Sequence, residues 1–448
     1  MIKKFLASAS LWSIIGVGLR VGGGLITLPL ALKKLSPAEL GLYYTFVGLT
    51  GLVMLLDFGF SQTIGRNAAF AMGGAKEFQA IGIPESSGNS EPNWTLLAKL
   101  LAAVKIWYHS TGILLVVLML LPGSFFLLPL IKAAGLSQHY LTCWWLFAGV
   151  TVFSFVSTYW PGLLFGIGSV KSAARIGMIA QGIGLALLIA ALLMGAGLWS
   201  YAISSFVSTT ISLILTRKAF SQDAGKSLQI EIDRQSRNQV LLQLWPMAWR
   251  QGLVMIGAFL IQRGNTLICS HELGLEETAS YGLTFNVLNL IFQVIIIPLG
   301  LAWPMIGRLR VERDFKKIRK IFFLRLYGGL SAAIIVLYCL ALWGNWGLEI
   351  LGAKTDLLPT SLLALLSAIS FLECHHSQYA GLVLSENKNP FVWSAILSGV
   401  AIFCLSWWAA DIWGLLGMIL AQGCVQLAWN NWWPVIRGLK GVYPTKLA

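Results

Sequence analysis

Long apolar runs separated by short polar segments dominate the chain. A helix needs about 20 residues to cross roughly 30 Å of hydrocarbon, and twelve runs come close to or exceed that length. They cover about 8–32, 41–65, 107–131, 140–166, 172–196, 199–217, 240–268, 280–306, 322–346, 358–385, 391–410 and 412–436. Stretches such as Gly112 to Leu121 do not alternate as the strands of a transmembrane barrel would. The pattern predicts an all-α integral membrane protein with twelve transmembrane helices.

The composition excludes an ordinary water-soluble globule. Of the 448 residues, 57% are hydrophobic and only 11% are charged, whereas soluble proteins have roughly 25% charged residues. The 6 cysteines lie singly in or beside apolar runs, without a C-x-x-C pair. This spacing supports neither a disulfide scaffold nor a zinc site, and we expect no metal and no cofactor.

The excess of 32 Lys and Arg over 18 Asp and Glu, a formal charge of +14, follows the predicted loops. Cytoplasmic loops of membrane proteins retain positive charge, so the distribution predicts that both termini are cytoplasmic. The densest basic stretch comprises Arg308, Arg310, Arg313, Lys316, Lys317, Arg319, Lys320 and Arg325. We therefore interpret most of the charge as topology and expect no nucleic-acid partner.

Two short matches relate the halves of the chain. Gly41, Leu42, Thr45 and Phe46 correspond to the run 282–285, with an offset of 241 residues at Gly41 and Leu42. The run 64–66 (Ile-Gly-Arg) corresponds to 306–308, at an offset of 242 residues. The matches predict two six-helix bundles, related by a parallel pseudo-two-fold repeat around a central cavity, an architecture typical of transporters. The predicted parts are residues 1–217, a partly amphipathic cytoplasmic linker at 218–239, and residues 240–448.

The region of helices 1 and 2 resembles a known family. The stretches Leu35 to Tyr43 (LSPAELGLY) and Leu55 to Phe60 (LLDFGF) are similar to the signature of the polysaccharide, or O-antigen (Wzx-type), flippases. These belong to the multidrug/oligosaccharidyl-lipid/polysaccharide exporter superfamily. The resemblance implies alternating-access transfer of an undecaprenyl-pyrophosphate-linked oligosaccharide to the outer leaflet of the bacterial inner membrane. It leaves open whether a polysaccharide polymerase and a chain-length regulator are partners.

Three arginines inside the predicted spans stand out, because topology does not explain them. Arg20 lies in helix 1, and Arg250 and Arg263 lie in helix 7. An arginine at the bilayer centre costs about 2.5–3.5 kcal/mol on insertion scales, and guanidinium groups suit phosphate. We predict that all three bind substrate, with a structural ion pair or snorkelling as the alternative. Arg66, at the end of helix 2, is a candidate headgroup contact or an ordinary topological anchor.

Amide side chains repeat on one face of helix 8, where Asn286, Asn289 and Gln293 follow i, i+3, i+7 spacing. Amides offer donors and acceptors to sugar hydroxyls. The alternative is hydrogen bonding between helices, which contributes about 0.6 kcal/mol per contact in membranes. A similar series on helix 12, Gln422, Gln426 and Asn430, we assign to packing.

Intramembrane acidic residues could couple transport to a proton or sodium gradient. Glu373 lies near the centre of helix 10 with His376 close by, a combination suited to binding and releasing a proton. A structural hydrogen bond and an arginine counter-ion are the alternatives. Asp57 on helix 2 lies deep enough to pair with Arg20, so we predict a structural or gating ion pair there.

Two other functions remain open at this point. A multidrug or cation antiporter of the same superfamily would favour acidic residues in its cavity, whereas three arginines here face a smaller set of carboxylates. A membrane-embedded polysaccharide polymerase or ligase would need catalytic groups in a sizeable outer loop, and the predicted outer loops are short. The sequence has no Walker A glycine loop with Lys and Ser/Thr. We predict a transporter and not an enzyme.

Overall fold

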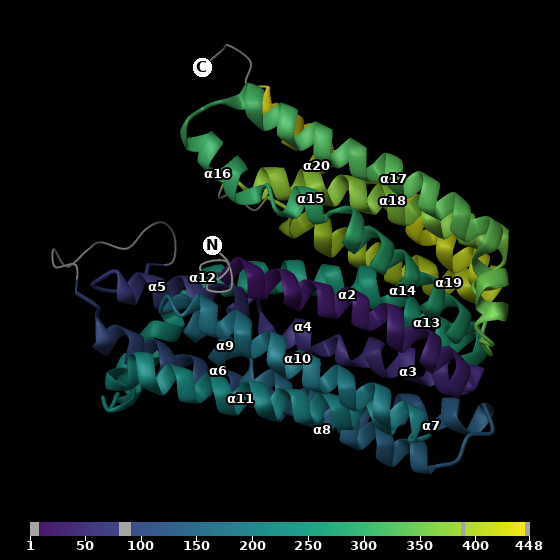
Figure 1. The fold of residues 1–448 in the computed structure, drawn as a ribbon, viewed down its shortest axis with the longest axis horizontal. Helices are drawn as coiled ribbons and strands as arrows, with labels where there is room; N and C mark the ends of the chain where they lie inside the picture. The colour runs from purple at the N-terminus through teal and green to yellow at the C-terminus, as the bar shows by residue number, and fades with distance from the viewer. Residues whose placement is uncertain (1–8, 80–90, 387–389, 444–448) are drawn as a thin grey trace. The chain divides into compact units, whose positions relative to one another are not determined.

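The protein is an all-α membrane fold, as predicted. A computed structural model describes residues 9–79, 91–386 and 390–443 (Figure 1), although a few side chains within them, including that of Arg20, are not described. These ranges contain helices and connecting turns but no β-strand. Nine of the described helices or helix runs are long and apolar enough to cross a membrane.

Each predicted span coincides with a helix or a run of helices. The first six spans correspond to α2 (Ala9–Lys34), α3 (Pro37–Thr50), α4 (Leu52–Asp57), α5 (Phe60–Met72), α6 (Trp94–Leu118), η1 (Met119–Gly123), α7 (Ser124–Ala133), α8 (His139–Ser157), α9 (Tyr159–Gly166), α10 (Val170–Leu193) and α11 (Trp199–Leu228). The other six correspond to α12 (Arg234–Phe259), η2 (Leu260–Gly264), α13 (Asn265–Glu272), α14 (Leu275–Ile295), α15 (Ile297–Gly300), α16 (Trp303–Val311), α17 (Phe315–Ile350), α18 (Thr360–Leu384), α19 (Val392–Val425), η3 (Gln426–Asn430) and α20 (Trp433–Val442).

Helices 11 and 12 of the prediction meet at Gly414, three residues beyond the expected boundary. Gly414 has φ 59° and ψ −142° inside α19, a left-handed conformation that favours glycine. On either side of it, the Ser406 hydroxyl donates to the Met418 carbonyl at 3.2 Å. A side chain at Gly417 would start 2.2 Å from the carbonyl oxygen of Ala409. The element α19 is therefore two helices packed against each other across this turn.

Helices 2 and 8 are both interrupted, and at matching positions. In helix 2, α4 and α5 are separated by Phe58 (φ 48°) and Gly59 (φ 69°). In helix 8, α15 ends at Gly300 and α16 begins at Trp303. The sequence offset that relates 64–66 to 306–308 maps the first break onto the second within one residue. The predicted internal repeat thus has a structural counterpart in two broken helices.

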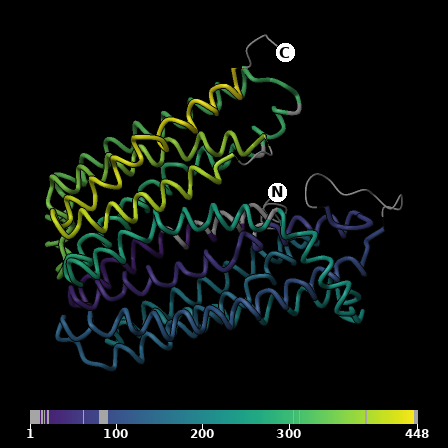
Figure 2. The backbone as a smooth tube through the Cα atoms, turned by 180° about the vertical axis from the view of Figure 1, so that it is seen from behind, coloured from purple at the N-terminus to yellow at the C-terminus, as the bar shows by residue number. Residues whose placement is uncertain are grey.

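The described chain forms two compact units. The first unit comprises residues up to Lys34 together with Leu49–Met255, and the second comprises Leu35–Gly48 with Ile256–Ala448. Long helices run side by side within each unit, as for α6, α8, α10 and α11 in the first and α17, α18 and α19 in the second (Figures 1 and 2). The predicted division at 218–239 stays a prediction. There α11 continues to Leu228, and Asp233 accepts the amide hydrogens of Gln235 and Ser236 at 3.0 Å where α12 begins.

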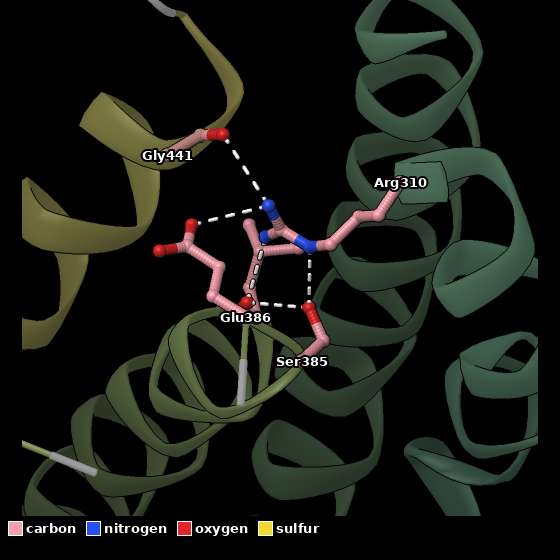
Figure 3. Close-up of polar contacts among 5 residues, drawn as sticks. Arg310, Ser385, Glu386 and Gly441 are labelled. Carbon is pink, nitrogen blue, oxygen red and sulfur yellow. Dashed lines mark hydrogen bonds and ion pairs between the residues drawn. The ribbon is translucent and has the colours of Figure 1, made fainter. Parts of the chain in front are cut away.

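The ends of α16, α18 and α20 are joined by one side chain of the basic stretch, Arg310 (Figure 3). Its Nε donates to Ser385 Oγ at 2.7 Å, one terminal nitrogen donates to the Leu382 carbonyl at 2.8 Å, and the other lies 3.1 Å from Glu386 Oε1. That last nitrogen also lies 3.4 Å from the Gly441 carbonyl oxygen. We call these five residues the Arg310 cluster. From the sequence, Arg310 was interpreted only as one of the positive charges of a cytoplasmic loop. The structure shows that it also holds helix ends together.

Candidate functional site

A polar cavity of about 490 Å³ lies within the second unit. Its walls come from α3, the continuous run of η2 and α13, α14 and α18, so four separate segments of the chain contribute side chains. Predicted site residues in its lining are Arg263, Asn286, Asn289, Gln293 and Glu373. The structure therefore brings together five of the ten residues that the sequence singled out.

Arg263 lies on η2, a π-helical turn between α12 and α13. Such turns interrupt α-helices and are frequent at functional sites. The flanking helix is held tightly, because a side chain at Gly257 would start 2.3 Å from the backbone of Ala395 on α19. Beyond the turn, Asn265 Nδ2 donates to Gln422 Oε1 at 2.8 Å. These contacts fix the backbone from which Arg263 projects, and they confirm a packing role for Gln422.

The guanidinium of Arg263 forms no ion pair with another described residue. Its Nε is buried and has no hydrogen-bond partner among the described atoms. Tyr43, which also lines the cavity, is close enough to interact electrostatically with this guanidinium. A buried donor without a partner carries a desolvation penalty of about 1–3 kcal/mol, and more when it is charged. An anion that entered the cavity would relieve this penalty.

The three amides of α14 share the cavity as the sequence predicted. The helix begins after Gly274 (φ 92°) and carries Asn286, Asn289 and Gln293 along one wall. Asn289 and Gln293 are exposed and make no hydrogen bond to another described residue, whereas Asn286 is half-buried. Packing between helices does not use these two amides. Their donors and acceptors are open to a polar ligand.

Glu373 is the acidic residue of the cavity. It lies on α18 with Ser370 and Ser377, and all three line the cavity. Its carboxylate has no ion pair in the described chain. His376 is not among the residues that line the cavity. Its Nδ1 lies 2.9 Å from Asn431 Oδ1 and 3.1 Å from the Leu372 carbonyl oxygen. Glu373 thus shares the cavity wall with two serines, of which Ser377 donates its hydroxyl to the Cys374 carbonyl at 2.8 Å, whereas His376 contacts Asn431.

Asp57 lies in the first unit, at the break in helix 2. Its Oδ1 accepts from the Tyr108 hydroxyl at 2.6 Å and its Oδ2 accepts from Ser61 Oγ at 2.7 Å. The predicted partner Arg20 lies on α2, but its side chain is outside the described residues. Both carboxylate oxygens therefore have partners from α5 and α6, and the ion pair with Arg20 stays a prediction.

Arg250 and Arg66 also belong to the first unit. Arg250 is exposed, and its guanidinium carbon lies 5.7 Å from the ring centroid of its neighbour Trp249. Arg66 is exposed on α5, toward the end of helix 2. Their roles in substrate binding stay predictions.

Among the polar lining residues, the sequence reasoning missed Tyr43, Tyr44, Gln262, Thr266 and Gln378. Tyr43 and Tyr44 lie between the matched residues Leu42 and Thr45, and Tyr44 packs on Gly282, which the repeat pairs with Gly41. A side chain at Gly282 would start 2.5 Å from the Tyr44 ring. Gln262 directly precedes Arg263, and two consecutive polar residues in an otherwise apolar run were a signal that could have marked it as a site residue.

Comparisons with known proteins place this geometry in context. No protein-family model matches the chain. A curated protein of Salmonella typhi, named "Putative O-antigen transporter", is 22% identical over 171 residues. The match covers 36% of this chain and 38% of that protein, so the chain spans well under half of the relative's length.

Solved structures match over nearly the whole chain. The MATE multidrug transporter DinF-BH is 15% identical and covers 100% of this chain and 98% of its own, with a TM-score of 0.63. An inward-facing multidrug resistance MATE family transporter of the MOP superfamily is 14% identical, with 96% and 98% covered and a TM-score of 0.61. The chain therefore has the fold of these MATE transporters. The fold that the resemblance implied is confirmed, and the proteins named here are transporters by their names.

Proposed function

We propose that this MATE-fold protein is a membrane transporter that moves an undecaprenyl-pyrophosphate-linked oligosaccharide from the cytoplasmic to the outer leaflet. The main observation that supports this proposal is the cavity of the second unit. There Arg263 has a buried Nε without a partner among the described atoms, and amide side chains of α14 line the same cavity. A lipid-linked glycan presents the two chemistries that these groups recognise, an anionic pyrophosphate and sugar hydroxyls.

The charges of the cavity support a phosphate rather than a neutral sugar alone. Guanidinium keeps its charge at all physiological pH values and offers paired donors to phosphate oxygens. Hydrogen bonds to charged groups contribute about 1.5–3 kcal/mol each. The O-antigen transporter name of the Salmonella relative agrees with a glycan cargo. We assign Arg20 and Arg250 to the same cargo, as cations of the other unit.

Location and partners follow from this proposal. We place the protein in the bacterial inner membrane with both termini in the cytoplasm, in agreement with the basic loops. A polysaccharide polymerase and a chain-length regulator would act on the flipped product. The alternating-access cycle would use the central cavity of the predicted pseudo-two-fold repeat.

Glu373 is the proposed site of coupling to a proton or sodium gradient. It lines the cavity with Ser370 and Ser377, and its carboxylate forms no ion pair with a described residue. Oxygen ligands of this kind bind a proton or a hard cation. Transport by Glu373→Gln should lose its dependence on an imposed pH or sodium gradient, while Ser377→Ala should retain that dependence with a smaller rate. A Glu373→Gln protein that still follows the gradient would remove Glu373 from this role.

A multidrug or cation antiporter is the second candidate, because Glu373 shares the cavity with Arg263. A cationic drug would bind near the carboxylate, and the structural neighbours are multidrug transporters by their names. The two functions predict opposite effects of one substitution. Removing the charge of Arg263 should abolish transport of an anionic lipid but should enhance binding of an organic cation.

The direct test uses the purified chain in liposomes loaded with a labelled undecaprenyl-pyrophosphate-linked oligosaccharide. Accessibility of the label to an external modifying enzyme reports how much lipid crosses the bilayer. Wild type should transfer the lipid and Arg263→Gln should not, and a deletion strain should accumulate the linked glycan on the cytoplasmic face. If the liposomes export cationic dyes instead and the deletion leaves glycans unchanged, the assignment fails.

A further inference from the structure

A second cationic feature lies in the first unit and shares no residue with the cavity just described. Lys105 on α6 and Arg217 on α11 approach the same indole ring, that of Trp160 on α9. Lys105 Nζ lies 5.9 Å from the ring centroid and the Arg217 guanidinium carbon lies 5.6 Å from it. Two positive charges, from α6 and α11, thus lie close to one aromatic side chain of α9.

Trp160 is a rigid support for these cations. It is only 4% exposed, and its ring meets Phe220 edge-on at 5.5 Å and Tyr159 at 5.2 Å between centroids. A cation over an indole face gains about 0.5–1 kcal/mol at exposed sites. One ring therefore offers a modest stabilisation to the two charges that share it.

No acidic side chain of the described residues compensates the pair. Neither Lys105 nor Arg217 forms an ion pair with a described residue, although their charges lie close enough to repel one another. Asp223, on the same helix as Arg217, accepts a hydrogen bond from Ser169 Oγ, and Asp57 is held by Tyr108 and Ser61. Two like charges held together without a counter-ion are destabilising unless an anion binds between them.

The site is open and lies where a headgroup would be. Arg217 is exposed and Lys105 is half-buried. Lys105 precedes the predicted span 107–131 and Arg217 ends the predicted span 199–217, so both lie at a predicted edge of the hydrocarbon layer. Phosphate groups populate that level of a membrane, and Arg and Lys are the side chains that bind them.

We propose that Lys105, Arg217 and Trp160 form a binding site for a phosphate-bearing anion, supplied by an anionic phospholipid headgroup or by free phosphate. This site does not depend on the proposed flippase function. Arg217 donates through its planar fork, Lys105 adds a point charge, and Trp160 holds both side chains over its ring.

The experiment compares two double variants of the full chain that remove the same charge from the same helices. Lys105→Gln/Arg217→Gln removes the pair, and Lys99→Gln/Lys218→Gln is the matched control, since neither of its lysines lies over Trp160. Native mass spectrometry counts the phosphatidylglycerol and phosphatidylcholine molecules that each protein retains. Wild type and the control should retain phosphatidylglycerol in preference to phosphatidylcholine. Lys105→Gln/Arg217→Gln should bind phosphatidylglycerol about tenfold more weakly, the change expected for the loss of one charged hydrogen bond.

A second arm identifies the source of the phosphate. Inorganic phosphate replaces chloride at equal ionic strength while the thermal midpoint is measured in detergent, because a ligand of the native state raises that midpoint. A midpoint that rises for wild type but not for Lys105→Gln/Arg217→Gln supports free phosphate, and selective phosphatidylglycerol retention supports the lipid. The exchange Lys105→Arg/Arg217→Lys keeps two cations and should keep binding even if the neutral variant folds poorly. The proposal is overturned if the neutral pair and its control bind both probes equally, or if wild type binds neither.

Discussion

Two arginines of the second unit, Arg310 and Arg263, differ in how the protein satisfies the hydrogen-bond donors of their guanidinium groups. Arg310 donates to a hydroxyl and to a backbone carbonyl and pairs with Glu386, so its donors are directed at protein acceptors (Figure 3). Arg263 lines a cavity, has no ion pair in the described chain, and keeps a buried Nε without a partner there.

The two arginines differ in whether the protein itself supplies acceptors for the guanidinium donors. A guanidinium whose donors are all used by the protein can offer little to a ligand. A guanidinium with an unmet donor is costly to the fold, and a bound anion would lower that cost. Perturbed and unpaired ionisable groups in cavities are accordingly candidates for function. Four substitutions test whether Arg263 and Arg310 differ in this way.

The largest effect is expected for Arg263→Gln. Removing a charged contact to a pyrophosphate should reduce transport about a hundredfold, because two charged hydrogen bonds of about 1.5 kcal/mol each are lost. The thermal midpoint should stay the same or rise, since the unpartnered donor is removed. Initial transport rates in liposomes, normalised to protein content, measure the first effect. Wild-type rates would place Arg263 outside the site.

Arg310→Ala should instead lower stability. It removes the contacts that join the ends of α16, α18 and α20, and it leaves the carboxylate of Glu386 without its partner, at a cost of about 3 kcal/mol. Thermal melting in detergent measures the change, with Arg310→Lys as a control that keeps the charge but lacks the forked donors. An unchanged midpoint would show that the Arg310 cluster contributes nothing to the packing of this unit.

Asn289→Ala should have a smaller effect on the apparent substrate affinity. One amide contact in a membrane protein contributes about 0.6 kcal/mol, which corresponds to about a threefold rise in KM. The maximal rate and the thermal midpoint should change little. Substitution of the exposed Asn238 in the first unit serves as the control, and equal KM changes for both variants would argue against an amide wall.

The smallest effect is expected for Arg308→Ala. Arg308 belongs to the same basic stretch as Arg310, but its side chain is 81% exposed and pairs only with Glu312 at 2.8 Å among the described residues. Exposed pairs of this i, i+4 kind contribute about 0.3–0.5 kcal/mol. The midpoint should therefore fall far less than for Arg310→Ala, and a comparable fall would erase the distinction between the two arginines.

Much of the fold followed from the sequence because apolar length is a strong signal. The twelve predicted spans all coincide with helices. The breaks at Phe58–Gly59 and at Gly300–Trp303 were not predicted, since both lie inside continuous apolar runs. The internal repeat was visible only as two short matches, and the matching breaks now strengthen it.

The cavity was predicted in part. Helical spacing sufficed for Asn286, Asn289 and Gln293, because one face of one helix is fixed by periodicity. Spacing alone did not fix the contacts of His376, which lies three residues from Glu373 and contacts Asn431. Its role in ion coupling stays a prediction. Nothing in the sequence distinguished Arg310 from its basic neighbours, because its partners lie 72 to 131 residues away along the chain.

The most direct test of this account is the binding of undecaprenyl pyrophosphate to purified wild type, Arg263→Gln and Arg310→Gln, measured in parallel by native mass spectrometry below the lowest thermal midpoint. The account predicts that Arg263→Gln loses the bound lipid while its midpoint is maintained, and that Arg310→Gln keeps the lipid while its midpoint falls. Equal lipid binding by all three proteins, or loss only in Arg310→Gln, would contradict it.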